Sequence, residues 1–296
     1  MNCKPTLTAL VRLARPKHWI KNVFVLLPVP FAFALKTVGT EGFSILAFLL
    51  GLAGFCLVNS AVYTLNDLFD AGADLLHPRK RLRPIAAGQV SRLAAAVQIV
   101  VLLVVGLGLC VAAERSYSVT IALVYVALNV VYNLGAKNVA LLDVFLLSSG
   151  FVIRVLLGCA LVSAPPSAWL LLCTSTLALF LGFAKRRADL TGGLHHDHRP
   201  SLRGYNMAFL DHAMSICAGV AILAYALYCI EVMKSLQPGR EMASMPFVAY
   251  GVLNYLRMVH VEGIGGSPVD VACRSLSTQA CAIGWLVTVT WSLGLW

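Results

Sequence analysis

Long apolar runs are the feature that most constrains how this 296-residue chain can fold. Each is long enough to cross, as a helix, a hydrocarbon core about 30 Å thick. Charged residues make up 12% of the chain, about half their usual share in a soluble domain. We therefore expect an all-α polytopic membrane protein with nine transmembrane helices. They are predicted at about 23–40, 43–65, 93–113, 116–134, 140–162, 166–184, 211–233, 242–260 and 276–296.

The N-terminal segment differs from these runs. Residues 9–21 mix basic and apolar residues and are expected to form an amphipathic interfacial helix, with Trp19 at headgroup depth. Pro28 and Pro30 interrupt the first span. A short apolar core followed by a small-residue cleavage site is not apparent, so no removable signal peptide is expected. We predict a single transmembrane domain over 1–296.

Loops rich in Lys and Arg alternate along the chain with loops that have few, and this alternation sets the expected orientation in the membrane. With a cytoplasmic N-terminus and an external C-terminus, most of the 23 Lys and Arg residues fall on the cytoplasmic side. The predicted location is a bacterial inner (plasma) membrane. Most carboxylates fall on the same side, which the positive-inside rule does not explain. The polar chemistry is therefore expected to face the cytoplasm. Nucleic-acid binding is disfavoured, because the basic residues are scattered over short loops.

Three aspartates directly follow one apolar run. On a helix, Asp67, Asp70 and Asp74 would lie within roughly 60° of one face. Like charges so placed repel one another unless a cation or a proton holds them. Mg²⁺ binds carboxylate oxygens and often completes its shell with substrate phosphates. The cluster, with Asn66 beside it, predicts a Mg²⁺–diphosphate site at a membrane surface.

A basic block follows the aspartates at once. Lys80, Arg81 and Arg83 suit the phosphate oxygens that a metal leaves unneutralised. Alternatively, these basic residues only face the lipid headgroups beside a solvated helix end and have no role in substrate binding.

A second polar cluster lies between two later runs. Tyr132 and Lys137 precede Asp143, which opens the next predicted helix. A functional Asp143 would bind a second metal or a substrate hydroxyl, with Lys137 on a phosphate. Alternatively, Asp143 is an ordinary acid at a helix N-terminus. Arg154 falls near mid-bilayer, where it must face the interior, either in a structural hydrogen bond or on an anionic lipid head.

Other polar segments carry weaker signals. Residues 185–187 (KRR) end a span and could contact phosphate or only reflect topology. Residues 195–198 (HHDH) lack zinc-site spacing and are expected to be a solvated loop. The glycine-rich residues 263–266 are weak evidence for phosphate binding. The nine cysteines are interpreted as small hydrophobic residues.

These motifs resemble the UbiA superfamily of intramembrane prenyltransferases. Its first aspartate-rich motif matches N-D-x-x-D-x-x-x-D at 66–74. Within the superfamily the chain is most similar to the branch that transfers phosphoribose to decaprenyl phosphate. The matching blocks are 15–22 (RPKHWIKN), 77–88 (HPRKRLRPIAAG), 185–190 (KRRADL) and 198–205 (HRPSLRGY). The similarity runs from about residue 10 to the end.

The resemblance implies nine transmembrane helices, a cytosol-facing site and a Mg²⁺-dependent phosphoribosyltransferase. Its substrates would be phosphoribosyl pyrophosphate (PRPP) and a polyprenyl phosphate, and its product would lead to cell-wall arabinan (arabinogalactan) precursors. Asp67, Asp70 and Asp74 would bind the metal, and the implied catalytic set is Asp67, Asp70, Lys21 and Asp143. The implied substrate-binding residues are Asn66, Asp74, Lys17, Asn22, Lys80, Arg81, Arg83, Tyr132, Lys137, Arg154, Lys185, Arg186, Arg187 and Arg199.

Some residues depart from the family patterns. Prenyltransferases that act on aromatic rings usually carry a second motif with two aspartates, whereas Asp143 stands alone here. Asp189 stands where the phosphoribosyl branch usually has Glu, and 268–274 is less charged than its counterpart. One alternative is a prenyltransferase with a polyprenyl diphosphate donor and an aromatic acceptor. Another is a cation-coupled transporter, disfavoured because the charges lie at the predicted helix ends and not at mid-membrane. A homo-oligomer remains open.

Overall fold

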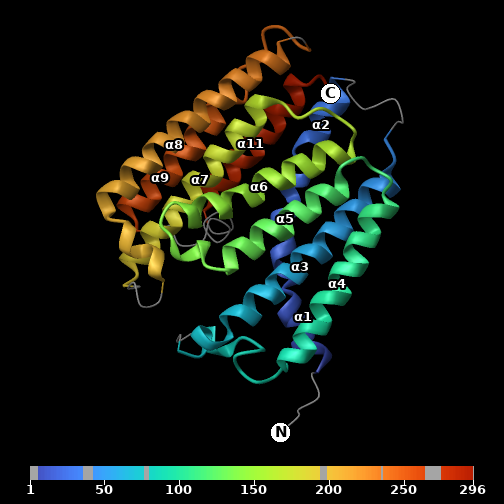
Figure 1. Ribbon diagram of the computed structural model, residues 1–296. Helices are drawn as coiled ribbons and strands as arrows, with labels where there is room; N and C mark the ends of the chain where they lie inside the picture. Colours follow the sequence, from blue (N-terminus) through green and yellow to red (C-terminus); the bar gives the residue numbers. More distant parts are fainter. Residues whose placement is uncertain are drawn as a thin grey trace. The chain divides into compact units, whose positions relative to one another are not determined.

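The computed structural model describes residues 6–35, 43–76, 80–193, 199–234, 236–263 and 275–295, and every regular element in these ranges is helical (Figure 1). The elements are α1 (Leu7–Ala14), η1 (Pro16–Leu26), α2 (Pro28–Ala34), α3 (Ile45–Leu76), η2 (Lys80–Leu82), α4 (Arg92–Ala112), α5 (Ser118–Asn133), η3 (Ala136–Asn138), α6 (Leu142–Leu161), α7 (Ala168–Thr191), η4 (Pro200–Gly204), α8 (Met207–Tyr228), η5 (Cys229–Met233), α9 (Met245–Val261) and α11 (Leu276–Ser292).

Five helical segments of the described chain are long and apolar enough to cross a membrane. They are 45–75 in α3, α4, α6, α7, and α8 continued through Val232. Helix α5 is apolar but shorter. Helices α9 and α11 have 17 residues each, about 25 Å. An all-helical membrane fold is therefore supported, while the nine-span count and the orientation of the termini stay predictions.

Two expected helices are wrong in detail. The interfacial helix predicted at 9–21 ends at Ala14, because Arg15 adopts a left-handed conformation (φ 50°) and Pro16 follows. The chain continues as the 3₁₀ helix η1. The span predicted at 23–40 is not one helix, since η1 ends at Leu26 and the short α2 follows. Residues 36–40 lie outside the described part.

Helix α3 extends well beyond the predicted end at 65. It runs to Leu76, so Asp67, Asp70 and Asp74 lie on one continuous helix, as considered for their spacing in the sequence. In the sequence after residue 65, the first proline is Pro78, so no earlier proline interrupts the helix.

The chain divides into two compact units. Unit 1 comprises Met1–Leu26, Gly39–Ala136 and Leu156–Ala164. Within it, α3 and α4 pack closely where two glycines face each other. A Cβ built on Gly106 would lie 2.8 Å from the carbonyl oxygen of Gly54 and 3.0 Å from the backbone nitrogen of Val58. Only glycine permits this approach of two backbones.

Gly106→Ala is therefore expected to destabilise the protein by about 1–3 kcal/mol, because the clash is with backbone. Gly108→Ala is the matched control on the same helix, since a Cβ there meets nothing within 4 Å. The control is expected to be neutral or stabilising by up to about 1 kcal/mol. Unfolding midpoints in detergent measure both, and equal effects would contradict the close packing.

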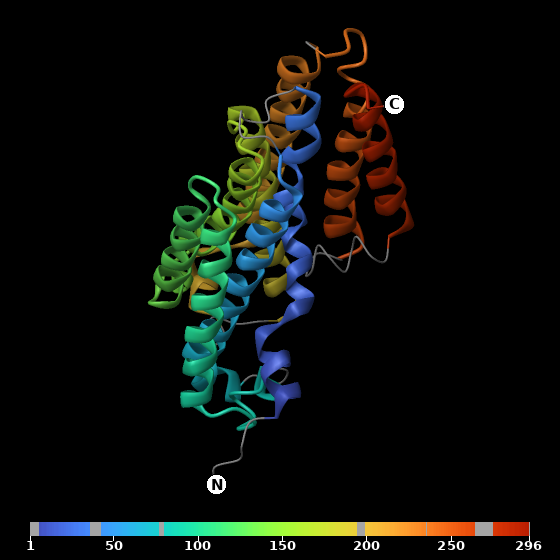
Figure 2. The same cartoon turned by 90° about the vertical axis from the view of Figure 1, so that its right-hand side faces the viewer.

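Unit 2 comprises Leu27–Val38, Lys137–Val155 and Pro165–Trp296. Its main core joins α6, α7, α8 and α9 through buried Val144, Phe180, Leu210 and Tyr255. Helices α9 and α11 run side by side within this unit (Figure 2). A second core cluster brings Phe31 of α2 against Tyr228 of α8.

Candidate functional site

The first polar cluster lies in unit 1 and is centred on Asp67 of α3. Asp67 and Asp74 are buried and Asp70 is partly exposed. Asp67 Oδ1 accepts a hydrogen bond from Arg15 Nη2 at 2.5 Å and lies 3.1 Å from Arg83 Nη1. The same Arg83 nitrogen donates to Asp74 Oδ2 at 2.7 Å. Arg83 therefore bridges two aspartates, and the repulsion expected between them is offset by arginines.

Arg15 was not among the residues predicted for the site. It stands at the C-cap of α1, and its left-handed backbone turns the chain into η1. Its guanidinium lies 5.6 Å from the centroid of the Tyr63 ring as well as on Asp67. The signal that could have identified it is the Arg-Pro pair at the start of the matching block 15–22.

Lys21 also reaches this part of α3. Its Nζ lies 3.5 Å from the Tyr63 hydroxyl and 5.9 Å from the centroid of the same ring. Cations from α1, η1 and the segment after η2 thus converge on one stretch of α3. Two segments far apart in the sequence, residues 15–21 and Arg83, therefore place positive charge on this part of α3.

One carboxylate oxygen of Asp67 is not used in these contacts. Oδ2 is buried and has no hydrogen-bond partner within the described ranges. A buried carboxylate oxygen without a donor is unfavourable, and a cation would satisfy it. No group of three or more His, Cys, Asp or Glu side chains placed to hold a metal exists among the described residues. Mg²⁺ commonly uses only one or two carboxylates with water and phosphate oxygens, so the donor set fits a metal that arrives with a phosphate ligand.

The three aspartates predicted to bind the metal have different surroundings in the structure. Asp67 offers an open oxygen, Asp70 lies one turn further along α3, and Asp74 is held by Arg83. A three-aspartate metal site stays a prediction.

Amide and hydroxyl side chains surround the cluster. Buried Asn22 accepts a hydrogen bond from Asn59 Nδ2 at 3.2 Å, and Tyr125 donates to Asn59 Oδ1 at 3.1 Å. Asn133 donates to Asn66. These bonds tie η1 and α5 to α3, so predicted substrate residues Asn22 and Asn66 serve the packing of the site in this state.

The remaining predicted residues of unit 1 are exposed or partly exposed. Lys17 and Arg81 are exposed, while Lys80 and Tyr132 are partly exposed. The motif residues His77, Pro78 and Arg79 lie outside the described part.

The second polar cluster lies in unit 2 around Asp143, in the first turn of α6. Asp143 is fully buried, and Tyr205 donates to its Oδ1 at 2.7 Å. Its Oδ2 accepts from Ser201 Oγ at 3.0 Å and from Arg199 Nη2 at 3.3 Å, and it lies 3.2 Å from Arg186 Nε. Both carboxylate oxygens are therefore occupied, and one side chain joins α6, α7 and η4.

Arg186 completes this cluster. It is fully buried and also contacts Asp189 Oδ2 through Nη1 at 2.6 Å. Neither Ser201 nor Tyr205 was predicted as a site residue, although both lie in the matching block 198–205. Their spacing from Asp143 in the chain explains why no local pattern indicated the contact.

Burial raises the pKa of the Tyr205 phenol, and its hydrogen bond to Asp143 raises it further. A group whose pKa is higher in the folded state contributes stability in full below its unfolded pKa of about 10 and loses it as pH rises through the folded value. We expect the difference in unfolding free energy between wild type and Tyr205→Phe to be constant from pH 7 to about 9.5. Chemical denaturation at stepped pH measures it, and a difference that shrinks below pH 9 would contradict this assignment.

Other predicted residues of unit 2 have separate contacts. Arg154 is buried, and its Nη1 donates to the Gly150 carbonyl at 2.7 Å. Arg187 Nε donates to Asp211 at 2.6 Å. Lys137 is partly exposed in η3, and Lys185 is exposed on α7. Residues 195–198 and most of the glycine-rich loop (264–266) lie outside the described ranges.

Comparison with known proteins places this chain in one family. Residues 25–260 match the UbiA prenyltransferase family. A decaprenyl-phosphate phosphoribosyltransferase of Mycobacterium tuberculosis is 32% identical over 95% of this chain and 92% of its own length. Another from Corynebacterium glutamicum is 30% identical over 95% of this chain and 85% of its own length.

A solved structure has the same fold. It is a UbiA homologue from Archaeoglobus fulgidus bound to GPP and Mg²⁺, with a TM-score of 0.71 and 18% identity, covering 97% of this chain and 98% of that one. The match over most of the chain establishes the family. This chain belongs to the UbiA prenyltransferase family, a family of membrane enzymes.

Proposed function

We propose that the protein transfers 5-phosphoribose from PRPP to a polyprenyl phosphate such as decaprenyl phosphate, with release of pyrophosphate. The relatives that span 95% of the chain are phosphoribosyltransferases by name. The observation that carries the proposal lies in unit 1. There, one carboxylate oxygen of Asp67 is open, the other contacts Arg15 and Arg83, and Lys21 lies on Tyr63 one turn earlier on α3. A magnesium pyrophosphate group needs this combination of a carboxylate for the metal and cations for the phosphates.

In the proposed reaction, a phosphate oxygen of the lipid attacks the anomeric carbon of the ribose. The bond from that carbon to pyrophosphate breaks, pyrophosphate leaves with the electron pair, and the configuration inverts. The attacking phosphate is already an anion, so no strong general base is required. Mg²⁺, when bound, would neutralise charge that develops on the leaving group.

The chain's own residues would bind and orient the donor. Arg83 bridges Asp67 and Asp74, and we propose that it turns to the pyrophosphate when the donor binds. Lys21, Lys80 and Arg81 are proposed to contact the remaining phosphate oxygens. Asn66 and Asp74 would support Asp67 and Asp70.

The second cluster is proposed to keep the structure around Lys185 and Arg199 in place. Arg186 and Asp143 are fully buried in contact with each other, so we assign them a positioning role in the state described here. Lys185 is exposed and is proposed to contact phosphate, with Lys137 and Arg199. We infer a bacterial plasma membrane location with the site facing the cytoplasm, and a product used for cell-wall arabinan.

A prenyltransferase with a polyprenyl diphosphate donor and an aromatic acceptor is the second candidate. The family name and the GPP bound to the Archaeoglobus fulgidus homologue favour it. The single aspartate at 143, with both oxygens taken by protein donors, disfavours a second metal of the kind that two aspartates would bind.

Offering both substrate pairs with Mg²⁺ to the purified protein separates these candidates. Mass spectrometry is expected to find a polyprenyl-phosphoryl-5-phosphoribose from PRPP and a panel of polyprenyl phosphates. Prenylated aromatic product, with no phosphoribosyl lipid, would support the second candidate instead. Substrate uptake into vesicles without pyrophosphate release would indicate a transporter.

A further inference from the structure

The 3₁₀ helix η1 arranges the N-terminal cations with a repeat of three residues. A 3₁₀ helix has three residues per turn, so side chains three positions apart lie one above the other on the same face. Residues 17, 20, 23 and 26 are exposed, whereas 19, 22 and 25 are partly or fully buried. His18 and Lys21 belong to the row between them. Arg15 opens the first turn, because its carbonyl accepts from the His18 backbone nitrogen at 2.9 Å.

The more buried row fastens η1 along α3. Trp19 Nε1 donates to Ser60 Oγ at 2.9 Å, and Asn22 Nδ2 donates to the Cys56 sulfur at 3.0 Å. Residue numbers fall along η1 as they rise along α3, so the two helices run antiparallel. A 3₁₀ helix of 11 residues is unusually long, and its weaker backbone bonds make it depend on such contacts.

Tyr63 of α3 meets the neighbouring row. Its ring centroid lies 4.9 Å from that of His18 and 5.6 Å from the guanidinium carbon of Arg15. Its hydroxyl oxygen lies 3.5 Å from Lys21 Nζ. One partly buried tyrosine thus touches three residues that are spaced three apart in the sequence. Because Arg15 also bonds Asp67, these contacts adjoin the proposed pyrophosphate site.

We propose that Tyr63 is a positioning residue for the donor's pyrophosphate and acts through Arg15 and Lys21. The inference rests on the proposed function. Arg and Lys side chains lose rotamer freedom when they bind phosphate, so cations that are already held in place bind it more tightly. The ring attracts the Arg15 guanidinium, and the hydroxyl accepts from Lys21. Such a contact coexists with a charge-assisted bond, since Arg15 donates to Asp67 at the same time.

A neutral aromatic side chain suits this task better than a carboxylate. A further carboxylate on Arg15 and Lys21 would offset their positive charge and repel the incoming pyrophosphate. Tyr63 holds both side chains without adding charge. The positive potential of this part of unit 1 is therefore kept for the anion.

Calorimetry of PRPP and of inorganic pyrophosphate binding to the purified full-length protein with Mg²⁺ tests the two contacts. Tyr63→Phe keeps the ring and is expected to raise the dissociation constant for PRPP about 2- to 5-fold, as loss of one weak hydrogen bond predicts. Tyr63→Leu removes ring and hydroxyl and is expected to raise it about 5- to 30-fold. Pyrophosphate is expected to show the same ratios, because the contact is with the phosphates and not with the ribose.

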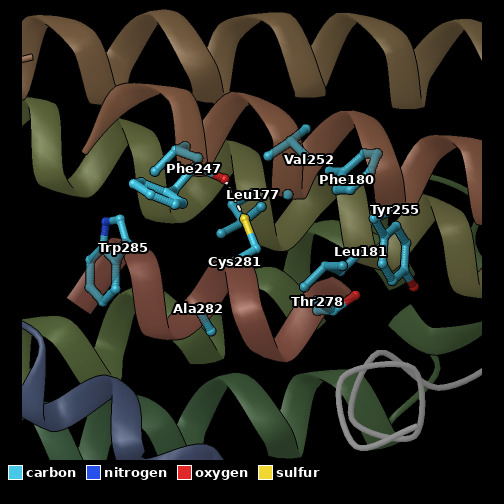
Figure 3. Close-up of a pocket in the computed structure, with 12 residues that line it drawn as sticks. Leu177, Phe180, Leu181, Phe247, Val252, Tyr255, Thr278, Cys281, Ala282 and Trp285 are labelled. Carbon is cyan, nitrogen blue, oxygen red and sulfur yellow. Dashed lines mark hydrogen bonds between the residues drawn. The ribbon is translucent and has the colours of Figure 1, made fainter. Parts of the chain in front are cut away.

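Two tyrosines of unit 2 provide the controls. Tyr255→Phe also removes a buried hydroxyl, from a side chain that lines the apolar pocket between α7, α9 and α11 (Figure 3). This lining is mainly aliphatic and aromatic and does not suit a phosphate. Tyr250→Leu replaces an exposed tyrosine of α9. Both variants are expected to bind PRPP as wild type does.

A double-mutant cycle distinguishes positioning from a general loss of structure. The hydroxyl is proposed to act through Lys21, so Tyr63→Phe combined with Lys21→Met is expected to bind PRPP no more weakly than Lys21→Met alone. A purely structural contribution would add to the loss in the double variant. Should Tyr63→Leu fail to fold, this cycle, which keeps the ring, still decides.

Two results would overturn the positioning role while leaving the proposed function intact. They are wild-type affinity of a folded Tyr63→Leu variant and additive losses in the cycle. A wild-type protein that binds neither PRPP nor inorganic pyrophosphate would instead refute the proposed function, and the role of Tyr63 with it.

Discussion

Asp67→Asn is expected to lower kcat/KM for phosphoribosyl transfer by at least about 10³-fold. The substitution keeps the shape of the side chain but removes the charge that faces Arg15 and Arg83, and with it the open oxygen proposed for the metal. Loss of electrostatic stabilisation of a leaving group is among the largest single effects that a substitution produces. Initial rates of pyrophosphate release measure it.

Two further variants make this result interpretable. Asp70→Asn is expected to cause a comparable loss, and because Asp70 is less buried, it tests the metal site with less risk to folding. Glu262→Gln is the control, since Glu262 pairs with Arg257 on the surface, where ion pairs contribute little. Near-normal turnover of a folded Asp67 or Asp70 variant would refute the metal assignment.

Asp143→Ala is expected to destabilise the protein by about 3–5 kcal/mol. The substitution leaves fully buried Arg186 without one of its two carboxylates and removes the acceptor of Ser201 and Tyr205. Removing one member of a buried ion pair is costly because the other charge stays desolvated. Unfolding midpoints in detergent measure the loss, and activity is expected to fall in parallel with the folded fraction.

The smaller contributions of this cluster can be separated. Tyr205→Phe removes two hydrogen bonds, the one donated to Asp143 and the one accepted from the Leu141 backbone nitrogen, and is expected to cost about 1–3 kcal/mol. Asp211→Asn, at the more exposed pair with Arg187, is expected to cost no more than about 1 kcal/mol. An Asp143→Ala variant with wild-type stability but no activity would contradict the positioning role and favour direct contact with substrate.

The helical fold could be predicted because the apolar runs leave few alternatives in a membrane. The errors occurred where local backbone chemistry competes with hydropathy. Arg15 ends α1 through a left-handed backbone, which no hydropathy pattern reveals. The apolar run ends at 65, whereas α3 continues to Leu76 and carries the aspartates on the same helix. In the structure, Arg15 and Arg83 offset the charges of Asp67 and Asp74, which favours continuation of the helix.

The two polar clusters were predicted, but most of their internal contacts were not. Asp67, Asp74 and Arg83 were selected for a metal and for phosphate, and the structure pairs them with one another. Asp143 meets Arg199, Ser201 and Tyr205, which lie 56, 58 and 62 residues away in the chain. Contacts at that separation depend on helix packing, which local spacing does not encode.

The central claim is that the aspartate cluster binds the pyrophosphate of a sugar donor. PRPP labelled with ³²P in its β-phosphate tests it most directly. The account predicts labelled pyrophosphate release that requires both Mg²⁺ and a polyprenyl phosphate, and that is lost in Asp67→Asn. Absence of release from PRPP, together with pyrophosphate release from a polyprenyl diphosphate by the same preparation, would contradict it.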